Sequence, residues 1–182
     1  MALRQILTEP NKILREKSLT VKVVDEDLQK LMDDMLETMY AAPGIGLAAI
    51  QVGVPKRVIV LDIAPKDKPN IAPKDKPKNP MYFVNPEIIS KSENSSTYEE
   101  GCLSVPGQFA EVNRPDKCHI KYLDYYGQPK EIKADGMLAT CIQHEIDHLE
   151  GILFIDYLSK LKKTMIIKKL SKQKKAIERI VV

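Results

Sequence analysis

The chain has 182 residues, a formal net charge of +3 at pH 7 and 43% hydrophobic residues, but no tryptophan. This size and composition predict one domain, residues 1–182, that is large enough to bury a hydrophobic core. No run of eighteen apolar residues occurs, and the N-terminal residues lack the long apolar region of a secretion signal, so we expect neither a membrane span nor export. Three cysteines do not make a disulfide framework, so we expect reduced thiols and a cytoplasmic location.

The first predicted helix covers residues 25–42 and follows an irregular lead-in that contains Pro10. Asp25 can cap the helix, and the acidic residues after it favour the positive end of the helix dipole. Apolar side chains recur at a spacing of three and four residues, which predicts one buried face. This face consists of Leu28, Leu31, Met32, Met35, Leu36 and Met39. We interpret its methionines as core packing rather than as ligands.

Small residues dominate the next segment, PGIGLAAIQVGVP, residues 43–55. It has neither a G-x-G-x-x-G pattern nor a Lys-Ser or Lys-Thr pair at the spacing of a phosphate-binding loop, so a phosphate site is not favoured. Glycines and alanines mark a backbone that another group approaches closely. Two interpretations stay open: a wall of small residues beside a pocket, with Gln51 as its polar side chain, or a glycine-rich turn with a surface glutamine.

Three segments further along the chain have the patterns of strands. Residues 57–63, RVIVLDI, are one, and residues 81–90 predict a second that is interrupted at Pro86. Residues 118–134 alternate between apolar and polar side chains and turn near Gly127, which predicts a hairpin. We therefore expect antiparallel sheet structure in the middle of the chain.

The remaining central segments are polar. Residues 63–78 contain a tandem duplication, IAPKDKPN followed by IAPKDKPK, whose composition predicts an exposed, mobile loop. Residues 92–100 are interpreted as a polar turn that leads into EGCLSVPG, residues 100–107. His119 lies in the first arm of the predicted hairpin and is expected to be a surface or structural residue rather than a ligand.

The pattern QHEIDHLEG, residues 143–151, places His144 and His148 four residues apart, with Glu145 directly after the first histidine. On a helix, two such histidines lie one turn apart on the same face and can bind one transition metal, with the glutamate near its open side. Asp135 is a candidate N-cap, and Gly151 stands where the helix would end. Apolar neighbours predict that this helix is mostly buried: they are Leu138, Cys141, Ile142, Leu149 and Ile152.

Two histidines are too few for a catalytic metal site, which usually has three protein ligands. Phe154 stands where the metzincin peptidases have a third histidine, and Glu178, in a lysine-rich tail, is a poor counterpart of the thermolysin-type glutamate. Cys141 lies about 10 Å along the helix from the second histidine, which is too far for a shared ion. The third ligand is therefore expected from another segment, and the donor types alone favour zinc.

The C-terminal residues 154–182 predict a partly amphipathic helix that is rich in lysine. Its expected apolar positions are Leu158, Leu161, Met165, Leu170 and Ile177. Such a run of lysines is usually a solvated face, but clustered lysines on one helix can also supply contacts to the phosphates of a nucleic acid.

Three segments, GIGLAAIQ (44–51), EGCLS (100–104) and QHEIDH (143–148), occur in the order typical of the peptide deformylases, and the whole chain resembles the bacterial members with a helical tail. The resemblance implies an α+β fold, with antiparallel β-sheets around a central metal-binding helix, an N-terminal helix and a C-terminal helix. It also implies removal of the formyl group from the N-terminal N-formylmethionine of nascent peptides, with release of formate. The alternatives are another metal-dependent peptidase or amidase with an HExxH motif, and a non-catalytic RNA-binding protein.

The resemblance implies one divalent metal ion per chain, held by Cys102, His144 and His148. Iron(II) is expected, although zinc, nickel or cobalt can occupy such a site. A water activated by the metal would attack the formyl carbon, and Glu145 would act as general base and then as general acid. In the family, the side-chain amide of Gln51 and the backbone N–H of Leu103 would stabilise the oxyanion.

The resemblance also implies an apolar pocket for the methionine side chain. Its expected substrate-binding residues are Gly44, Ile45, Gly46, Tyr98, Glu100, Gly101, Met137, Thr140 and Cys141, and Thr140 is more polar than such a pocket suggests. Arg114 is expected to pair with Glu100 and to brace the Cys102 segment. The expected partners are the formyl-Met peptide and, through the lysine-rich helix, the ribosome; no membrane is expected, and a monomer is favoured.

Overall fold

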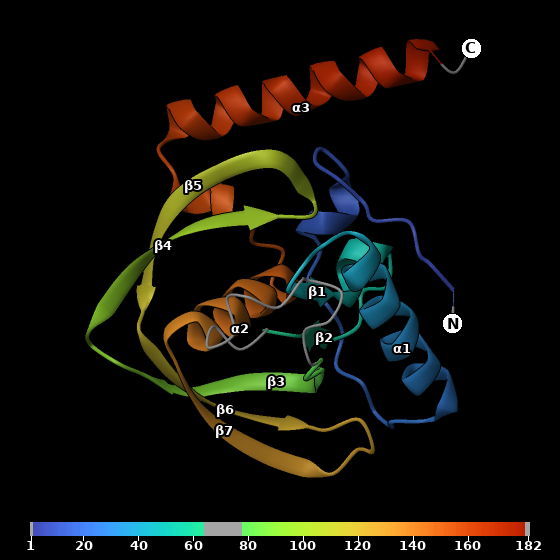
Figure 1. The fold of residues 1–182 in the computed structure, drawn as a ribbon, viewed down its shortest axis with the longest axis vertical. Coiled ribbons are helices and arrows are strands. Elements are labelled where there is room, and N and C mark those ends of the chain that lie inside the picture. Colours follow the sequence, from blue (N-terminus) through green and yellow to red (C-terminus); the bar gives the residue numbers. More distant parts are fainter. Residues whose placement is uncertain (1, 64–77, 181–182) are drawn as a thin grey trace.

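The computed structural model describes residues 2–63 and 78–180, and it has the α+β architecture that the sequence predicts (Figure 1). A five-stranded antiparallel sheet, in the order β1-β2-β3-β6-β7, and a two-stranded antiparallel sheet, β4-β5, surround the helix α2. The helices α1 and α3 lie outside this arrangement. Of the tandem duplication, all but the terminal residues Ile63 and Lys78 lie outside the described residues.

The elements follow one another along the chain in this order: η1 (Lys12–Arg15), α1 (Glu26–Ala41), β1 (Gly46–Ala48), η2 (Ala49–Val52), β2 (Val58–Leu61), β3 (Met81–Lys91), β4 (Ser95–Cys102), β5 (Val105–Pro115), β6 (Lys117–Leu123), β7 (Pro129–Asp135), α2 (Gly136–Leu149), η4 (Phe154–Tyr157) and α3 (Lys160–Ile180). The predicted hairpin of residues 118–134 is confirmed as β6 and β7, and Gly127 adopts a left-handed conformation in its turn.

Helix α1 forms where the sequence predicts it. The Asp25 side chain accepts a hydrogen bond from the Leu28 backbone N–H at 2.9 Å, which caps the helix. Its apolar face is buried against β1 and β2, as its spacing requires, except that Leu36 is only half-buried. The methionines of α1 are therefore core residues, as predicted.

Two predictions in the middle of the chain are changed by the structure. Strand β3 continues through Pro86 to Lys91, and the predicted interruption is found only in its pairing with β6, whose register shifts between Val84 and Glu87. Such an irregularity tolerates a residue without an N–H. Residues 95–100 are not a turn but the greater part of β4, which pairs with β5 along its length. Strand pairing supplies backbone hydrogen bonds that overrule the local preference of these polar residues.

Helix α2 runs through the centre of the molecule, and ten of its 14 residues are buried. Its apolar side packs on the concave face of the five-stranded sheet, where Ile142 and Leu149 join a cluster with Ile59 and Phe83. Asp135 occupies the N-cap position, but its side chain makes no capping hydrogen bond, contrary to prediction. Gly151 follows the helix end with a positive φ, as predicted.

Helix α3 packs only lightly on the rest of the molecule (Figure 1). Ile166, Ile167 and Leu170 contact a small apolar cluster that includes Val105 and Phe154. Leu161 and Met165, predicted to belong to the apolar face, are 72% and 62% exposed, because a helix of 3.6 residues per turn places them opposite Leu170. None of the described helices combines the length and the apolar character that crossing a membrane requires.

Candidate metal centre

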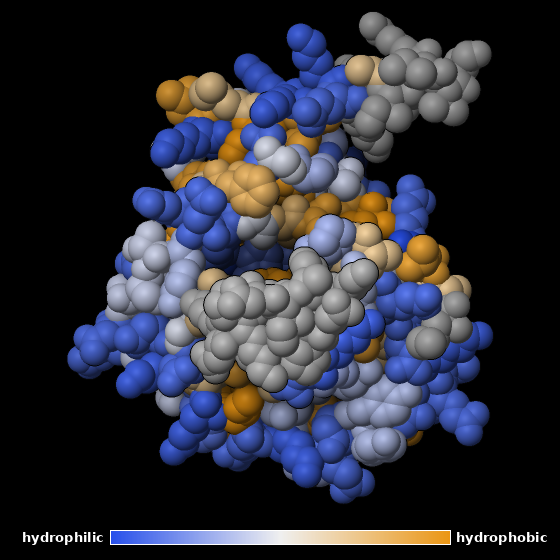
Figure 2. Space-filling model, viewed as in Figure 1, coloured by the Kyte–Doolittle hydropathy of each residue, from blue (hydrophilic) through white to orange (hydrophobic). Residues whose placement is uncertain are grey.

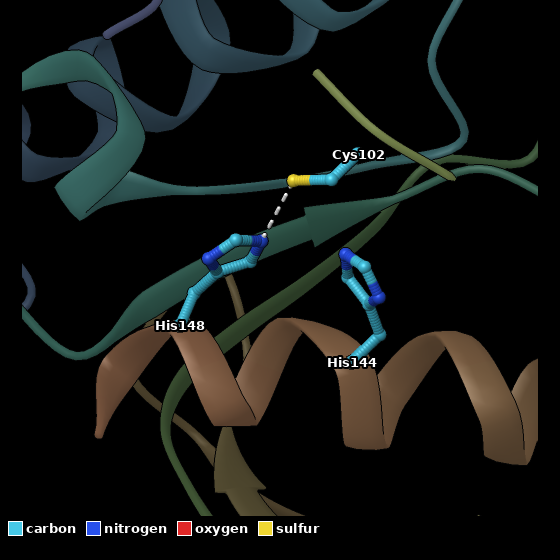
Figure 3. A group of neighbouring side chains, drawn as sticks. All are labelled: Cys102, His144 and His148. Atoms are coloured by element: carbon cyan, nitrogen blue, oxygen red, sulfur yellow. Dashed lines mark hydrogen bonds between the residues drawn. The ribbon is translucent and has the colours of Figure 1, made fainter. Parts of the chain in front are cut away.

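Three side chains from two separate elements converge beside α2. Cys102 ends β4, and His144 and His148 stand one turn apart on α2, so that one sulfur and two ring nitrogens all lie within 4.8 Å of one another (Figure 3). The Cys102 Sγ is 3.3 Å from the His148 Nε2. The donor that the helix lacks is thus supplied by a strand some forty residues earlier in the chain.

The chemistry of this group fits a transition metal. Thiolate sulfur and imidazole nitrogen are the usual ligands of zinc and iron in proteins, and a set of three leaves a coordination position for water or substrate. Burial lowers the pKa of His148, and the neighbouring His144 lowers it further, which favours the neutral ring that a metal requires. The buried His148 Nδ1 has no hydrogen-bond partner among the described residues, so only its Nε2 is engaged in the cluster.

His144 is oriented by a carboxylate. Its Nδ1 lies 2.8 Å from Glu100 Oε2, which leaves the other ring nitrogen for a metal. Burial alone would lower the pKa of His144, but its hydrogen bonds to Cys102 and Glu100 outweigh that effect and raise it. In metalloproteins a carboxylate behind a histidine fixes the tautomer and the orientation of the ring in this way.

Glu100 is held in turn by Arg114, which is 4% exposed. The guanidinium donates to both oxygens of the Glu100 carboxylate, at 2.6 and 3.1 Å, and to Asp147 at 2.7 Å. Burial raises the pKa of Glu100, but the hydrogen bonds from His144 and Arg114 lower it by more. Tyr157 completes the network by donating from its hydroxyl to Asp147 at 2.8 Å. The predicted contact between Arg114 and Glu100 is therefore part of a larger ionic network.

Glu145 lies beside the cluster with 5% of its surface exposed, and its Oε2 has no hydrogen-bond partner among the described residues. Burial is the main cause that raises its pKa, to about 7. The backbone of strand β1 lies close to this carboxylate at Gly46. A Cβ added there would lie only 2.3 Å from Glu145 Oε1. The same Cβ would lie 2.8 Å from Leu61 Cδ2, so a side chain at position 46 would displace the Glu145 carboxylate, Leu61 or both.

Gln51 is 2% exposed, so the interpretation of this residue as a surface glutamine is wrong. Its Oε1 accepts the Ala48 backbone N–H at 2.8 Å, which turns its Nε2 toward Ser104 Oγ at 3.0 Å and Cys102 Sγ at 3.5 Å. Ser104 is fully buried, and its own N–H also points at the sulfur. The amide of Gln51 is thus fixed with its donor side toward the metal cluster.

A cavity of about 490 Å³ opens beside the cluster. A hollow bordered by hydrophobic residues is visible near the centre of Figure 2. The cavity is lined by all nine residues named as substrate-binding, together with Gln51, Cys102, Leu103, His144, Glu145 and further residues of the 42–44 and 106–109 segments. The small-residue segment is therefore a pocket wall. Burial raises the pKa of Cys141 to about 12, so this thiol lines the cavity in its neutral form.

Some residues at this site lacked a signal in the sequence, and one histidine lies elsewhere. Ser104, Asp147 and Tyr157 hold the residues around the cluster. Ser104 and Asp147 lie within the EGCLS and QHEIDH segments but were given no role, and Tyr157 lies outside all three segments. Phe109 is 67% exposed at the cavity and lies against Gly101 across the β4-β5 ribbon. His119 contacts Glu131 in the β6-β7 hairpin, away from the site, as expected.

Comparison with known proteins gives consistent matches. The polypeptide deformylase family model matches residues 3–164. A peptide deformylase from Pelagibacter ubique is 64% identical over 175 residues, 96% of each chain, and one from Maricaulis maris is 57% identical over 179 residues, 98% of each. A peptide deformylase structure from Ehrlichia chaffeensis, in complex with actinonin, superposes with a TM-score of 0.87 at 44% identity, covering 95% of this chain and 98% of that one. One from Legionella pneumophila gives 0.85 at 46% identity, with 98% and 99% covered.

Proposed function

This chain belongs to the polypeptide deformylase family, hydrolases that remove the formyl group from N-formylmethionine, and we propose that Cys102, His144 and His148 hold its metal ion. The observation that carries the proposal is the convergence of one sulfur and two ring nitrogens within 4.8 Å. Another peptidase of the HExxH type is not favoured, because the family match extends over residues 3–164 rather than over the histidine motif alone.

The donor set supports one divalent ion per chain. We propose iron(II) as the ion in the cell, with zinc, nickel or cobalt as possible replacements, since thiolate and imidazole bind all four. When bound, such an ion lowers the pKa of a water molecule toward neutrality and polarises the formyl carbonyl. One thiolate and two neutral rings would leave the site a net charge of +1, which favours an oxyanion.

Glu145 is proposed to carry the proton of the reaction. Its carboxylate accepts a proton from the attacking water, whose oxygen bonds to the formyl carbon, and returns a proton to the amine as the carbon–nitrogen bond breaks and formate leaves. The free Oε2 supports this role, because no other described residue competes for it. The backbone of Gly46 restricts the carboxylate on its other side, which keeps it beside the cavity.

The oxyanion that develops on the formyl oxygen requires fixed donors. We assign this role to the Gln51 amide and to the backbone N–H of Leu103, the residue that directly follows Cys102. The hydrogen bond from the Ala48 N–H to Gln51 Oε1 supports the assignment, because it orients the amide before substrate binds. Arg114 acts through Glu100, which holds the His144 ring, and is a positioning residue.

The cavity is proposed to receive the methionine side chain of the substrate. Its volume of about 490 Å³ suits a side chain and the adjoining peptide groups, and its wall is mainly apolar. It opens directly beside Glu145 and the metal cluster, so the formyl group of a peptide bound there would lie near the reacting groups. The nascent peptide is thus the proposed partner at this site.

We also propose that the whole chain acts as one domain, as a monomer in the cytoplasm, and that α3 docks on ribosomal RNA. Exposed lysines along α3 support docking: Lys160, Lys162, Lys168, Lys169 and Lys172. Charge reversal at Lys168, Lys169 and Lys172 should reduce cosedimentation with ribosomes while free peptides are still deformylated. Unchanged cosedimentation would refute docking without affecting the assignment of the catalytic site.

The direct test is formate release from a formyl-Met peptide by protein loaded anaerobically with iron(II), or with nickel. Release that stops on chelation and returns with added metal supports the assignment. An inactive metal-loaded protein would refute the proposed site, and cleavage of an internal peptide bond in place of formate release would revive the peptidase alternative.

A further inference from the structure

Thr140 differs from the other threonines in the helices of this protein. Thr38 in α1 and Thr164 in α3 each donate their hydroxyl to the carbonyl four residues earlier, at 2.7 and 2.8 Å. Thr140, near the start of α2, makes no such bond, and its Oγ1 has no hydrogen-bond partner among the residues that the structure describes. A threonine hydroxyl in a helix normally satisfies itself on the preceding turn, so an exception requires an explanation.

The position of Thr140 connects it to the substrate cavity. It is 3% exposed and lies on the cavity-facing side of α2, one turn before His144 and between Met137 and Cys141. Its hydroxyl oxygen is out of contact with water. A buried hydroxyl without a partner destabilises the folded protein, whereas a methyl group of the same size in that place would not. The free protein therefore retains an unfavourable polar group at the cavity wall.

The surroundings offer the hydroxyl few alternatives. The neighbouring Cys141 thiol is neutral and is a weak partner. Tyr98, Glu100 and Glu145 also line the cavity, but none of them forms a hydrogen bond with Thr140 Oγ1. Rotation about the Cα–Cβ bond can exchange the methyl and the hydroxyl of a threonine, so the hydroxyl of a cavity-lining threonine can be presented to a ligand. A ligand that brings a hydrogen-bond acceptor into the cavity would satisfy this donor.

We propose that Thr140 is a specificity-determining residue, and that its hydroxyl donates a hydrogen bond to the thioether sulfur of the substrate methionine. The inference rests on the proposed binding of that side chain in this cavity. Thioether sulfur is a weak acceptor, whereas the methylene group that replaces it in norleucine accepts nothing. The two side chains are nearly equal in size, so a purely apolar pocket would hardly distinguish them.

The test compares two peptides, formyl-Met-Ala-Ser and formyl-norleucyl-Ala-Ser, on wild type and Thr140→Val at equal metal content. Valine keeps the shape of threonine and removes the hydroxyl. The ratio of kcat/KM for methionine over norleucine should fall about two- to fivefold in Thr140→Val, the lower part of the range for one net hydrogen bond, because sulfur is a weak acceptor. Thr140→Ser is the matched control: it keeps the hydroxyl and should retain most of the preference for methionine.

A second measurement separates this role from a structural one. If the hydroxyl is unpartnered in the free protein, Thr140→Val should unfold thermally at a midpoint no lower than that of wild type. A clearly lower midpoint would mean that the hydroxyl is already paired and would overturn the inference. An unchanged substrate ratio in active enzyme would also overturn it, while the proposed function would stand. Failure of wild type to deformylate either peptide would overturn both.

Discussion

Helices α2 and α3 are both rich in polar residues, but they place them in opposite environments. Ten of the 14 residues of α2 are buried, including Gln143, His144, Glu145 and His148. In α3, Leu170 alone is buried among the residues whose side chains the structure describes, and the described lysines other than the half-buried Lys163 are exposed. Burying a polar group is costly unless it is paired, so polar side chains inside a molecule indicate a function more strongly than polar side chains on its surface.

The pairing around α2 accounts for how these groups are tolerated. A chain of contacts runs from His144 through Glu100 to Arg114 and on to Asp147. Three buried polar atoms of α2 have no partner among the described residues: Thr140 Oγ1, Glu145 Oε2 and His148 Nδ1. Thr140 and Glu145 line the cavity, and His148 is a proposed metal ligand, so all three belong to residues with a proposed role at the site.

The largest effect is expected from the two cysteines that line the cavity. Cys102→Ser should lose tightly bound metal and nearly all deformylase activity, because a hydroxyl is a poor replacement for a thiolate ligand. Cys141→Ser should keep both in large part, since that thiol belongs to the wall. Elemental analysis and formate release on the two variants test this pair. Equal metal loss in both would show that the ligand assignment is wrong.

Glu145→Gln should come next. The amide keeps the size of the side chain but cannot accept the proton, so kcat should fall by about 10²–10⁴-fold. Metal content should remain at the wild-type level, because this residue is not a proposed ligand. The measurement is formate release together with elemental analysis. Activity within about tenfold of wild type would remove Glu145 from its role as the proton carrier.

Arg114→Met tests whether the ionic network supports the site. It leaves Glu100 buried without its main partner, which should reduce the free energy of unfolding by about 3–5 kcal/mol. Activity should fall by about 10–100-fold, because the orientation of His144 depends on Glu100. Denaturant titration and metal affinity are the measurements. Arg114→Lys keeps the charge without the two-pronged contact and should lie between wild type and Arg114→Met.

The smallest effects are expected in α3, where substitutions on the packed face and on the exposed face should change the stability of the protein by different amounts. Leu170→Ala should reduce the free energy of unfolding by about 2–3 kcal/mol, since Leu170 is buried in the cluster with Val105 and Phe154. Leu161→Ala, at 72% exposure, should change it by less than about 0.5 kcal/mol. Thermal or denaturant unfolding checks both. Similar losses in both variants would mean that Leu161 is buried in solution.

Local sequence patterns predicted most of the helices and strands, but they failed for a segment whose structure depends on pairing with a distant strand. The apolar spacing and the Asp25 cap predicted α1, and alternation predicted the β6-β7 hairpin, because both signals lie within a few residues of one another. Residues 95–100 were predicted as a turn because they are polar, and only their pairing with β5 makes them a strand. Leu161, Met165 and Leu170 were predicted to share one apolar face of α3. Of these three residues, only Leu170 packs on the rest of the molecule, together with Ile166 and Ile167.

For the site, the pattern of residues 143–148 was enough to predict two histidines one turn apart on the same face of a buried helix, with a glutamate beside them, because residues four apart on a helix share a face. It also required a third ligand from elsewhere. Which residues surround that turn was decided by the tertiary structure, which brings Cys102, Gln51 and Glu100 to α2 from distant segments. Sequence spacing is silent about such contacts, because they depend on how the strands cross the helix rather than on any local repeat.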